Sequence, residues 1–175
     1  MTRRARRLLD ALEAGSALIP LYARGPRLVD HALVDEENFE ELMFLRWYRT
    51  AWGYACATFT IHGRPKEAIF MHRAVLGLFK GDKEQGDHIN GDRLDNRRAN
   101  LRIVTIAENR QNQAARGGTS PHRGVSWSAK EGRWVAQAKC NGLYYCERFD
   151  DEEQAARAVS AWREAHMPFT NEARA

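Results

Sequence analysis

Apolar and polar residues alternate with different periods along this chain of 175 residues, and each change of period predicts an element. Over 35–45 the apolar residues recur every three or four positions. This spacing predicts a helix, with acidic residues at its start, where the helix dipole favours them. Over 54–61 and 68–71 the side chains alternate, and the turn residues at 62–65 between these runs predict a β-hairpin. Proline and glycine residues force an extended, turning backbone over 18–27.

The last third of the chain predicts a small sheet followed by one helix. Three short runs of alternating side chains predict strands at 123–127, 133–139 and 143–149. Asn141-Gly142 is a strong hairpin dipeptide, so the last two runs are expected to pair antiparallel. Residues 150–166 predict the helix, which Asp150 can cap together with Glu153.

Residues 87–113, DHINGDRLDNRRANLRIVTIAENRQNQ, combine many amides and charges with regularly placed apolar residues. A core segment does not need so many amides, because each buried polar group must find a partner. A disordered tail would not carry apolar residues at such regular places. The segment predicts a strand at 87–89, a turn, a second strand at 101–104, and a helix capped by Thr105.

Three side chains of this segment could converge on one point: Asp87 and His88 on the first strand and Asn109 on the helix. Carboxylate and amide oxygens are hard ligands that suit Mg²⁺. A neutral His beside such an ion can act as general base for a water nucleophile. From spacing alone this signal is weak, because a lone His is more often a hydrogen-bonded structural residue.

The net charge of +4 is distributed unevenly along the chain. Between His88 and Arg116, Arg residues outnumber Asp and Glu, as expected for a surface that meets a phosphate backbone. For any single Arg, a solvated role is as good an interpretation. The candidate phosphate contacts are Arg97, Arg98, Arg102 and Arg110. Asn96 and Asn112 are interpreted as loop and helix-surface hydrogen bonders that could touch DNA, and His72 as a residue that orders a helix start.

Several classes of protein are disfavoured by the sequence. No apolar run approaches the ~20 residues of a membrane span, and the Arg-rich start lacks the apolar core of a secretory signal. Cys56, Cys140 and Cys146 form no CxxC pair, so we expect reduced thiols and neither a disulfide framework nor a cysteine zinc site. We therefore expect a cytoplasmic protein, located in the host cytoplasm if a phage encodes it.

The run 87–113 resembles the HNH (His-Me finger) nuclease motif, in the Asn-rich form of phage and intron-borne homing endonucleases. The resemblance implies a ββα-metal core at about 85–113. In that family Asp87 would bind the catalytic metal, His88 would activate the water, and Asn100 would hold the loop. Asn109 would be the second metal ligand. The implied ion is Mg²⁺, with Mn²⁺ as the alternative, and no small-molecule cofactor is expected.

Residues 122–162 resemble the APETALA-type, ethylene-response-factor DNA-binding domain. In that family the open face of a three-stranded sheet lies in the major groove and reads bases. Carried over, the contacts would be Ser126, Ser128, Arg133, Gln137, Lys139 and Tyr145. This chain has fewer Arg on that face than the plant pattern. The alternative is a sheet that merely packs on the nuclease core.

Together these patterns predict an α+β protein with a nuclease region at 1–116, a linker at 117–122 and a DNA-binding module at 123–175. The expected function is hydrolysis of phosphodiester bonds in double-stranded DNA by a phage-borne homing or nicking enzyme. A monomer would nick one strand, whereas a homodimer could cut both. The rival class is a non-catalytic phage DNA-binding or regulatory protein on the same fold. A third interpretation, an RNA-directed or virion component, rests on the basic character alone.

Overall fold

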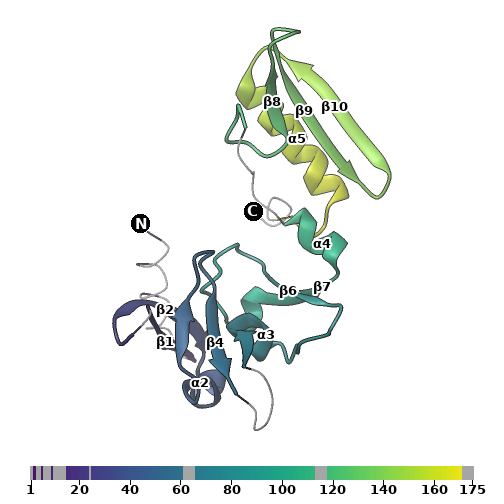
Figure 1. Cartoon of the computed structure of the whole chain (residues 1–175). Helices are drawn as coiled ribbons and strands as arrows, with labels where there is room; N and C mark the ends of the chain where they lie inside the picture. The colour runs from purple at the N-terminus through teal and green to yellow at the C-terminus, as the bar shows by residue number, and fades with distance from the viewer. Residues whose placement is uncertain are drawn as a thin grey trace. The chain divides into compact units, whose positions relative to one another are not determined.

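The computed structural model describes residues 15–23, 25–60, 66–112 and 118–170, together with Thr2, Ala5 and Leu9. The chain divides into two compact units, residues 1–106 and 107–175, each of which is described by itself (Figure 1). This division falls after Ile106, the first residue of helix α4, whereas the sequence placed the linker at 117–122. The boundary between the nuclease region and the DNA-binding module stays a prediction. The predicted turn at 62–65 and the residues at 113–117 lie outside the described residues.

The first unit contains a five-stranded sheet in the order β2-β1-β3-β4-β5. Its strands are β1 (Ser16–Tyr22), β2 (Leu28–Asp35), β3 (Trp47–Arg49), β4 (Ala55–Phe59) and β5 (Glu67–Phe70). Neighbouring strands are antiparallel except β1 and β3, which meet in parallel at Tyr22 and Tyr48. The predicted β4–β5 hairpin is confirmed. A second hairpin, β1–β2, begins where the sequence indicated only extended and turning chain.

Two short helices complete the core of this unit, α2 (Glu36–Met43) and α3 (Met71–Val75). The first confirms the prediction for 35–45. The indole N–H of Trp47 donates to the carbonyl of Leu42 (2.6 Å) near the end of α2. Because Trp47 is almost fully buried, this bond satisfies its one polar group. The core joins sheet, helices and the following loop through Ile19, Leu21, Ala32, Val34, Leu42, Trp47, Ala55, Ala57, Met71, Val75, Leu94 and Leu101.

A two-stranded hairpin follows, made of β6 (Gln85–His88) and β7 (Leu101–Val104), with a short 3₁₀ turn at Arg98–Asn100 between them. The long β6–β7 loop is fastened to β2, the edge strand of the larger sheet. The N–H of Leu33 donates to the carbonyl of Leu94 (2.8 Å), and the N–H of Asn96 donates to the carbonyl of Leu33 (2.7 Å). The loop thus covers a stretch of strand edge that would otherwise expose backbone groups.

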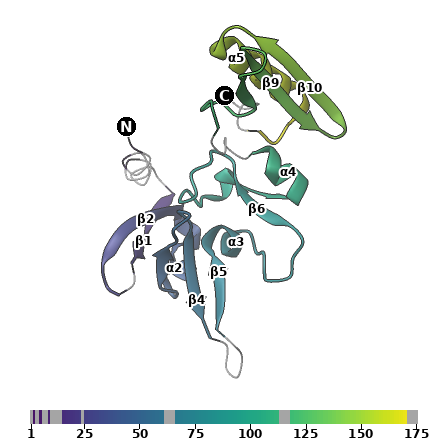
Figure 2. The ribbon, with the colours of Figure 1, turned by 45° about the horizontal axis from the view of Figure 1, so that its top comes forward.

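The second unit contains a three-stranded antiparallel sheet in the order β10-β9-β8, with one helix against it. The strands are β8 (Val125–Ser128), β9 (Arg133–Cys140) and β10 (Leu143–Phe149), and the helix is α5 (Glu152–His166). Figures 1 and 2 show α5 lying across one face of the sheet. Val125, Ala136, Ala155 and Val159 form the buried centre of this contact. The predicted strands and helix are confirmed, but the N-cap is Asp151 and not Asp150, since Asp151 accepts from the N–H of Gln154 (2.8 Å).

Helix α4 (Ile106–Gln111) belongs to the second unit except for its first residue, and it is held there at its carboxyl end. The guanidinium of Arg123 donates to the carbonyls of Arg110 and Gln111, which the last turn of a helix leaves without helical partners. The side chain of Gln111 in turn accepts from the N–H of Phe169 (3.3 Å). Arg163, which is 3% exposed, donates to the carbonyl of Arg123. The Arg123 side chain therefore joins α4 to the sheet module.

Both units mix strands and helices, which confirms the α+β class. The order β6, β7, α4 is that of the predicted ββα unit, but the packing of α4 on the hairpin stays a prediction. Within the described parts of the chain, none of the helices has the length and apolar character that a membrane-spanning helix requires.

The position of Gly124 is expected to limit the stability of the second unit. Its φ is +79°, and a Cβ there would lie 2.5 Å from the carbonyl oxygen of Gln137. Gly124→Ala should therefore lower the free energy of unfolding by about 3 kcal/mol in urea titrations followed by tryptophan fluorescence. Gly132→Ala is the matched control, because Gly132 also has a positive φ, of +62°, but nothing lies within 4 Å of the added Cβ. An equal loss of unfolding free energy in both variants would show that the backbone strain of a positive φ dominates, and not the clash of the Cβ with the Gln137 carbonyl.

Candidate functional site

Asn100 ties together the two ends of the β6–β7 loop, which carries most of the candidate residues. Its side chain donates from Nδ2 to the carbonyl of Asp95 (2.7 Å) and accepts at Oδ1 from the N–H of Asn90 (3.0 Å). The carbonyl of Asn100 also accepts from the N–H of Ile89 (2.9 Å). Asn100 is buried, so these bonds satisfy its amide while they close the loop. This is the arrangement that the structural role expected for Asn100 requires.

His88 ends β6 and is 4% exposed. Its Nε2 lies 3.2 Å from Oδ1 of Asn96, a residue that is fully buried. Burial lowers the pKa of His88, because an imidazolium ion loses its hydration there. The Asn96 hydrogen bond and the charges of Asp87, Asp95 and Asp92 act in the opposite direction, and burial outweighs them. His88 is therefore neutral near pH 7, the state that a general base requires.

Aromatic rings line one side of His88. The ring of His72 meets it edge to face at a centroid distance of 4.9 Å, and the ring of Tyr54 lies at 6.0 Å. Burial lowers the pKa of His72 to about 3, and electrostatic interactions with the neighbouring His88 and Arg73 lower it further. His72 fits only because residue 86 is glycine: a Cβ on Gly86 would lie 2.6 Å from Cδ2 of His72. His72 thus does more than order a helix start, since it is a wall of the His88 site.

Asp87 forms an ion pair with Arg102, the residue directly opposite it in the β6–β7 register. The guanidinium donates to Oδ2 of Asp87 from Nε (2.8 Å) and from Nη2 (2.6 Å). Both side chains are about nine-tenths buried, with exposed fractions of 11% for Arg102 and 10% for Asp87. Removing one partner would leave a buried charge, which is strongly destabilising.

Three of the four Arg residues expected to contact phosphate are engaged within the chain. Arg97 forms two hydrogen bonds of 2.9 Å with the carboxylate of Asp95, and Arg102 is paired with Asp87 as described. The guanidinium of Arg98 donates to the carbonyl of Val75 (2.7 Å). Acids and carbonyls of the same unit thus hold these three side chains, and their contact with DNA stays a prediction. Arg110 is exposed on α4.

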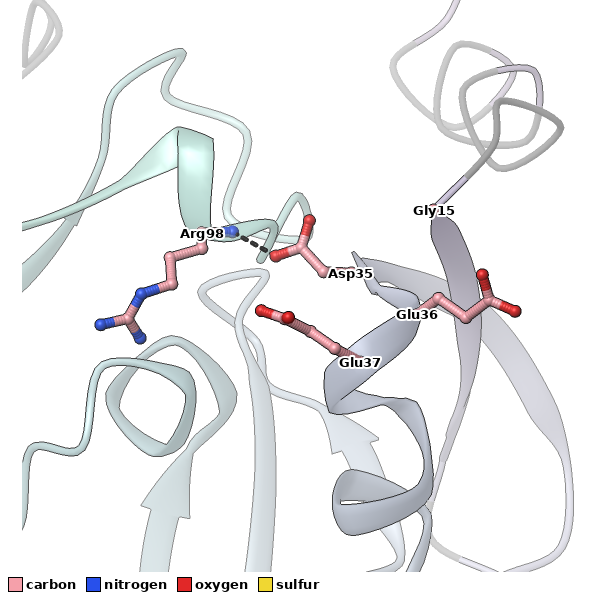
Figure 3. A pocket seen from close by; sticks show the side chains of 5 residues that line it. All are labelled: Gly15, Asp35, Glu36, Glu37 and Arg98. Carbon is pink, nitrogen blue, oxygen red and sulfur yellow. Dashed lines mark hydrogen bonds between the residues drawn. The ribbon is translucent and has the colours of Figure 1, made fainter.

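A cavity of about 540 Å³ lies beside the start of α2, and Figure 3 shows its lining. Gly15, Asp35, Glu36, Glu37 and Arg98 form its walls. The backbone N–H of Arg98 donates to Oδ2 of Asp35 (2.6 Å), while the Arg98 guanidinium points away from the carboxylates (Figure 3). None of Asp87, His88 and Asn100 lines this cavity, so we interpret the Asp35–Arg98 bond as a joint between α2 and the β6–β7 loop.

Asn109, the second expected metal ligand, is half-buried on α4 in the second unit. Its convergence with Asp87 and His88 stays a prediction. Among the described residues, no group of three or more His, Cys, Asp and Glu side chains is placed to hold a metal ion.

The open face of the β8–β10 sheet carries most of the side chains expected to read DNA. Arg133, Gln137 and Lys139 are exposed on β9, on the side away from α5. Tyr145 is a correction to the sequence-based expectation. It pairs with Ala138 across the strands, and its ring stacks on Trp162 of α5 at 5.9 Å. Tyr145 therefore faces the helix, and its neighbour Tyr144, 64% exposed, pairs with Lys139 on the open face.

Sequence reasoning missed three members of the His88 site. Asn96 was interpreted as a loop residue that could touch DNA, yet it is buried and contacts His88. Tyr54 was treated only as a strand residue. Arg93, whose guanidinium lies 4.7 Å above the Tyr54 ring, was not singled out. For Asn96 a signal existed, since an amide between Asp95 and Arg97 in a segment with buried Leu94 has few ways to reach solvent.

One protein family matches part of the chain. The sequence model of the HNH endonuclease family matches residues 70–111, a segment that includes α3, the whole β6–β7 hairpin and α4. This segment is an HNH endonuclease domain by that comparison, and the resemblance found in the sequence is confirmed to that extent. The β8–β10 sheet lies outside the match. No curated protein and no solved structure matches the chain.

The buried, neutral His72 should make stability depend on pH. Its folded pKa of about 3 is below the ordinary 6.5, so the unfolded chain takes up this proton at a higher pH than the folded chain does. Above pH ~6.5, His72 does not lower the free energy of unfolding. As pH falls from there toward ~3, the free energy of unfolding should drop by up to about 1.4 kcal/mol per pH unit. Urea unfolding at several pH values should show a smaller slope for His72→Leu. Identical slopes in the two proteins would contradict a buried, neutral His72.

Proposed function

We propose that this chain is a metal-dependent endonuclease that hydrolyses phosphodiester bonds in double-stranded DNA, with His88 as general base. The observation that carries the proposal is a buried, neutral His88 next to the Asp87 carboxylate, inside the segment that matches the HNH endonuclease family. A neutral imidazole can accept a proton from water and so act as general base. The resemblance to phage and intron-borne homing endonucleases further favours a homing or nicking enzyme.

In the proposed reaction His88 accepts a proton from water, and the resulting nucleophile attacks the scissile phosphorus. We assign the imidazole proton to Nε2, which faces the Asn96 amide oxygen, so that the basic lone pair lies on Nδ1. The bond from phosphorus to the 3′ oxygen breaks and this oxygen takes up a proton from solvent, so the products carry 5′-phosphate and 3′-hydroxyl ends. Burial keeps His88 uncharged before the reaction, while Asp87 and Asp95 stabilise the imidazolium ion that forms.

The residues present fit a hard divalent cation, Mg²⁺ or Mn²⁺. Asp87 Oδ2 is paired with the Arg102 guanidinium, and the Asp87 carboxylate and the Asn109 amide supply hard oxygen donors. Asp87 and Asn109 would hold the ion, and their oxygen donors suit a metal that keeps several waters. When bound, the ion would neutralise negative charge that develops on the phosphate.

The β8–β10 sheet is proposed as a DNA-docking module. Its open face displays Arg133, Gln137 and Lys139, which can contact phosphates and base edges. Tyr144 replaces Tyr145 in this proposal, because Tyr145 packs against α5. The chain contains one His88 site, so a monomer would nick one strand, and a homodimer could cut both.

Purified protein incubated with supercoiled plasmid should convert it to relaxed or linear product in Mg²⁺ or Mn²⁺ but not in EDTA. His88→Ala should slow cleavage at least about 100-fold, because a general base contributes 10²–10⁴ to the rate. Asp87→Asn should also abolish cleavage, and it keeps the shape of the side chain facing Arg102. Glu40→Gln, a change of an exposed acid on α2, should have no effect.

Binding of the same DNA in EDTA separates the proposed enzyme from its rival. His88→Ala should bind DNA as the unchanged protein does; Asp87→Asn is left out of this comparison, because it removes the anion that pairs with the buried Arg102. A protein that binds but never cuts would instead be the non-catalytic DNA-binding protein. Normal cleavage by His88→Ala would refute the assignment of the base.

Asn96 should act as a positioning residue for His88. In metal-free protein, long-range ¹H–¹⁵N spectra should show His88 with its proton on Nε2, because that nitrogen faces the Asn96 oxygen. Asn96→Ala should give a mixture of tautomers and reduce kcat about 10- to 100-fold with little change in KM. A His88 protonated on Nδ1 in the unchanged protein would exclude this role.

A further inference from the structure

The turn between β3 and β4 presents a tryptophan to solvent on a fixed backbone. The Trp52 side chain is 73% exposed, although large aromatic side chains contribute most when buried. The turn is closed by three hydrogen bonds: Thr50 N–H to the Tyr54 carbonyl (2.9 Å), Gly53 N–H to the Thr50 carbonyl (2.9 Å) and Tyr54 N–H to the Thr50 hydroxyl (3.0 Å). An exposed indole on such a defined turn is preorganised for a partner.

This turn is joined to the His88 site. Arg93, from the β6–β7 loop, donates from Nη1 to the carbonyl of Trp52 (2.6 Å), and its guanidinium lies 4.7 Å above the ring of Tyr54. The Tyr54 ring is in turn 6.0 Å from the ring of His88. Trp52 is therefore held at the rim of the proposed active site through its main chain, which leaves the indole available for contact.

The surroundings of the indole are basic. Arg93 is exposed, and a guanidinium nitrogen of Arg49 comes within 3.8 Å of the Cβ position of Gly53, the residue next to Trp52. The Arg49 side chain is 50% exposed, and its Nε forms an ion pair with Oδ2 of Asp30 at 3.7 Å. A flat apolar ring on a turn whose main chain lies near two Arg side chains is complementary to a nucleotide, which offers a flat base and an anionic phosphate. It suits an apolar protein surface poorly, since the cations would lose hydration there.

We propose that Trp52 stacks on a nucleobase of the DNA substrate, next to the phosphate that the His88 site attacks, with Arg93 and Arg49 facing the flanking phosphates. This proposal rests on the proposed function. The indole either covers a base that has left the duplex or wedges into a base step, and both increase access to the backbone. Trp52 thereby belongs to the DNA-binding surface of the first unit, in addition to any contacts made by the β8–β10 sheet.

The test is the affinity of the full chain for a fluorescein-labelled DNA duplex in EDTA, at one fixed salt concentration, since such binding depends on salt. Trp52→Ala should raise Kd about 5- to 150-fold, the loss of one stacked base, and Trp52→Phe should lie between it and the unchanged protein. The substitution keeps the main-chain bond to Arg93, and the side chain is mostly exposed, so the fold should be retained. Phe44→Ala is the matched control, because Phe44 is 88% exposed at the end of α2, and its Kd should not change.

A duplex with 2-aminopurine at successive positions locates the stacked base. Quenching at one position, lost in Trp52→Ala, is the expected result. Equal Kd values for Trp52→Ala and the unchanged protein would overturn the stacking proposal. If both proteins still cleave plasmid, the proposed nuclease function is unaffected by that result. If the unchanged protein binds without cutting and Trp52→Ala binds more weakly, the nuclease fails and Trp52 remains a DNA contact. If the unchanged protein neither binds nor cuts, both proposals fall.

Discussion

The site depends on the pairing of the β6–β7 loop with the edge of the larger sheet. Two hydrogen bonds join Leu33 to Leu94 and Asn96, and each contributes only about 1 kcal/mol. The buried Leu94 beside them contributes about 2 kcal/mol, so apolar burial stabilises this contact between the loop and β2 about as much as the two hydrogen bonds together. The hydrogen bonds have a different consequence: they fix the register. A loop shifted by one residue would turn Asn96 away from His88 and place a neighbouring charge in its position.

Two neighbouring residues of β6, Asp87 and His88, therefore have opposite electrostatic surroundings. His88 is kept neutral by burial among Asn96, His72 and Tyr54, which provide polar or aromatic contacts but no full charge. Asp87, the residue before it, forms a direct ion pair with Arg102. Because successive residues of a strand point to opposite faces, adjacent positions can have these different surroundings. An acid and a base can thus occur next to each other in sequence without neutralising each other.

The sequence predicted the elements around the site because their signals are local. Turn residues between alternating runs fixed the β6–β7 and β9–β10 hairpins, and the Thr105 and Asp150–Glu153 region marked helix starts to within a residue. The Asn96–His88 contact could not be predicted in this way, since it depends on Leu33 in a distant strand. The face of Tyr145 is different. A two-residue Asn141-Gly142 turn pairs Cys140 with Leu143, which already places Tyr145 opposite Ala138 on the helix side. That signal was present and was overlooked.

The residues at positions 86 and 72 can be substituted only together. A side chain at residue 86 has no room while an imidazole occupies the space above it, and the imidazole is itself one wall of the His88 site. In a library that randomises single positions, substitutions of Gly86 would therefore be selected against because they lack space, and not because residue 86 takes part in catalysis. Only paired changes, with a smaller residue at 72 and a larger one at 86, would reveal how much freedom the site has. The surroundings of the base can be redesigned only by changing both positions together.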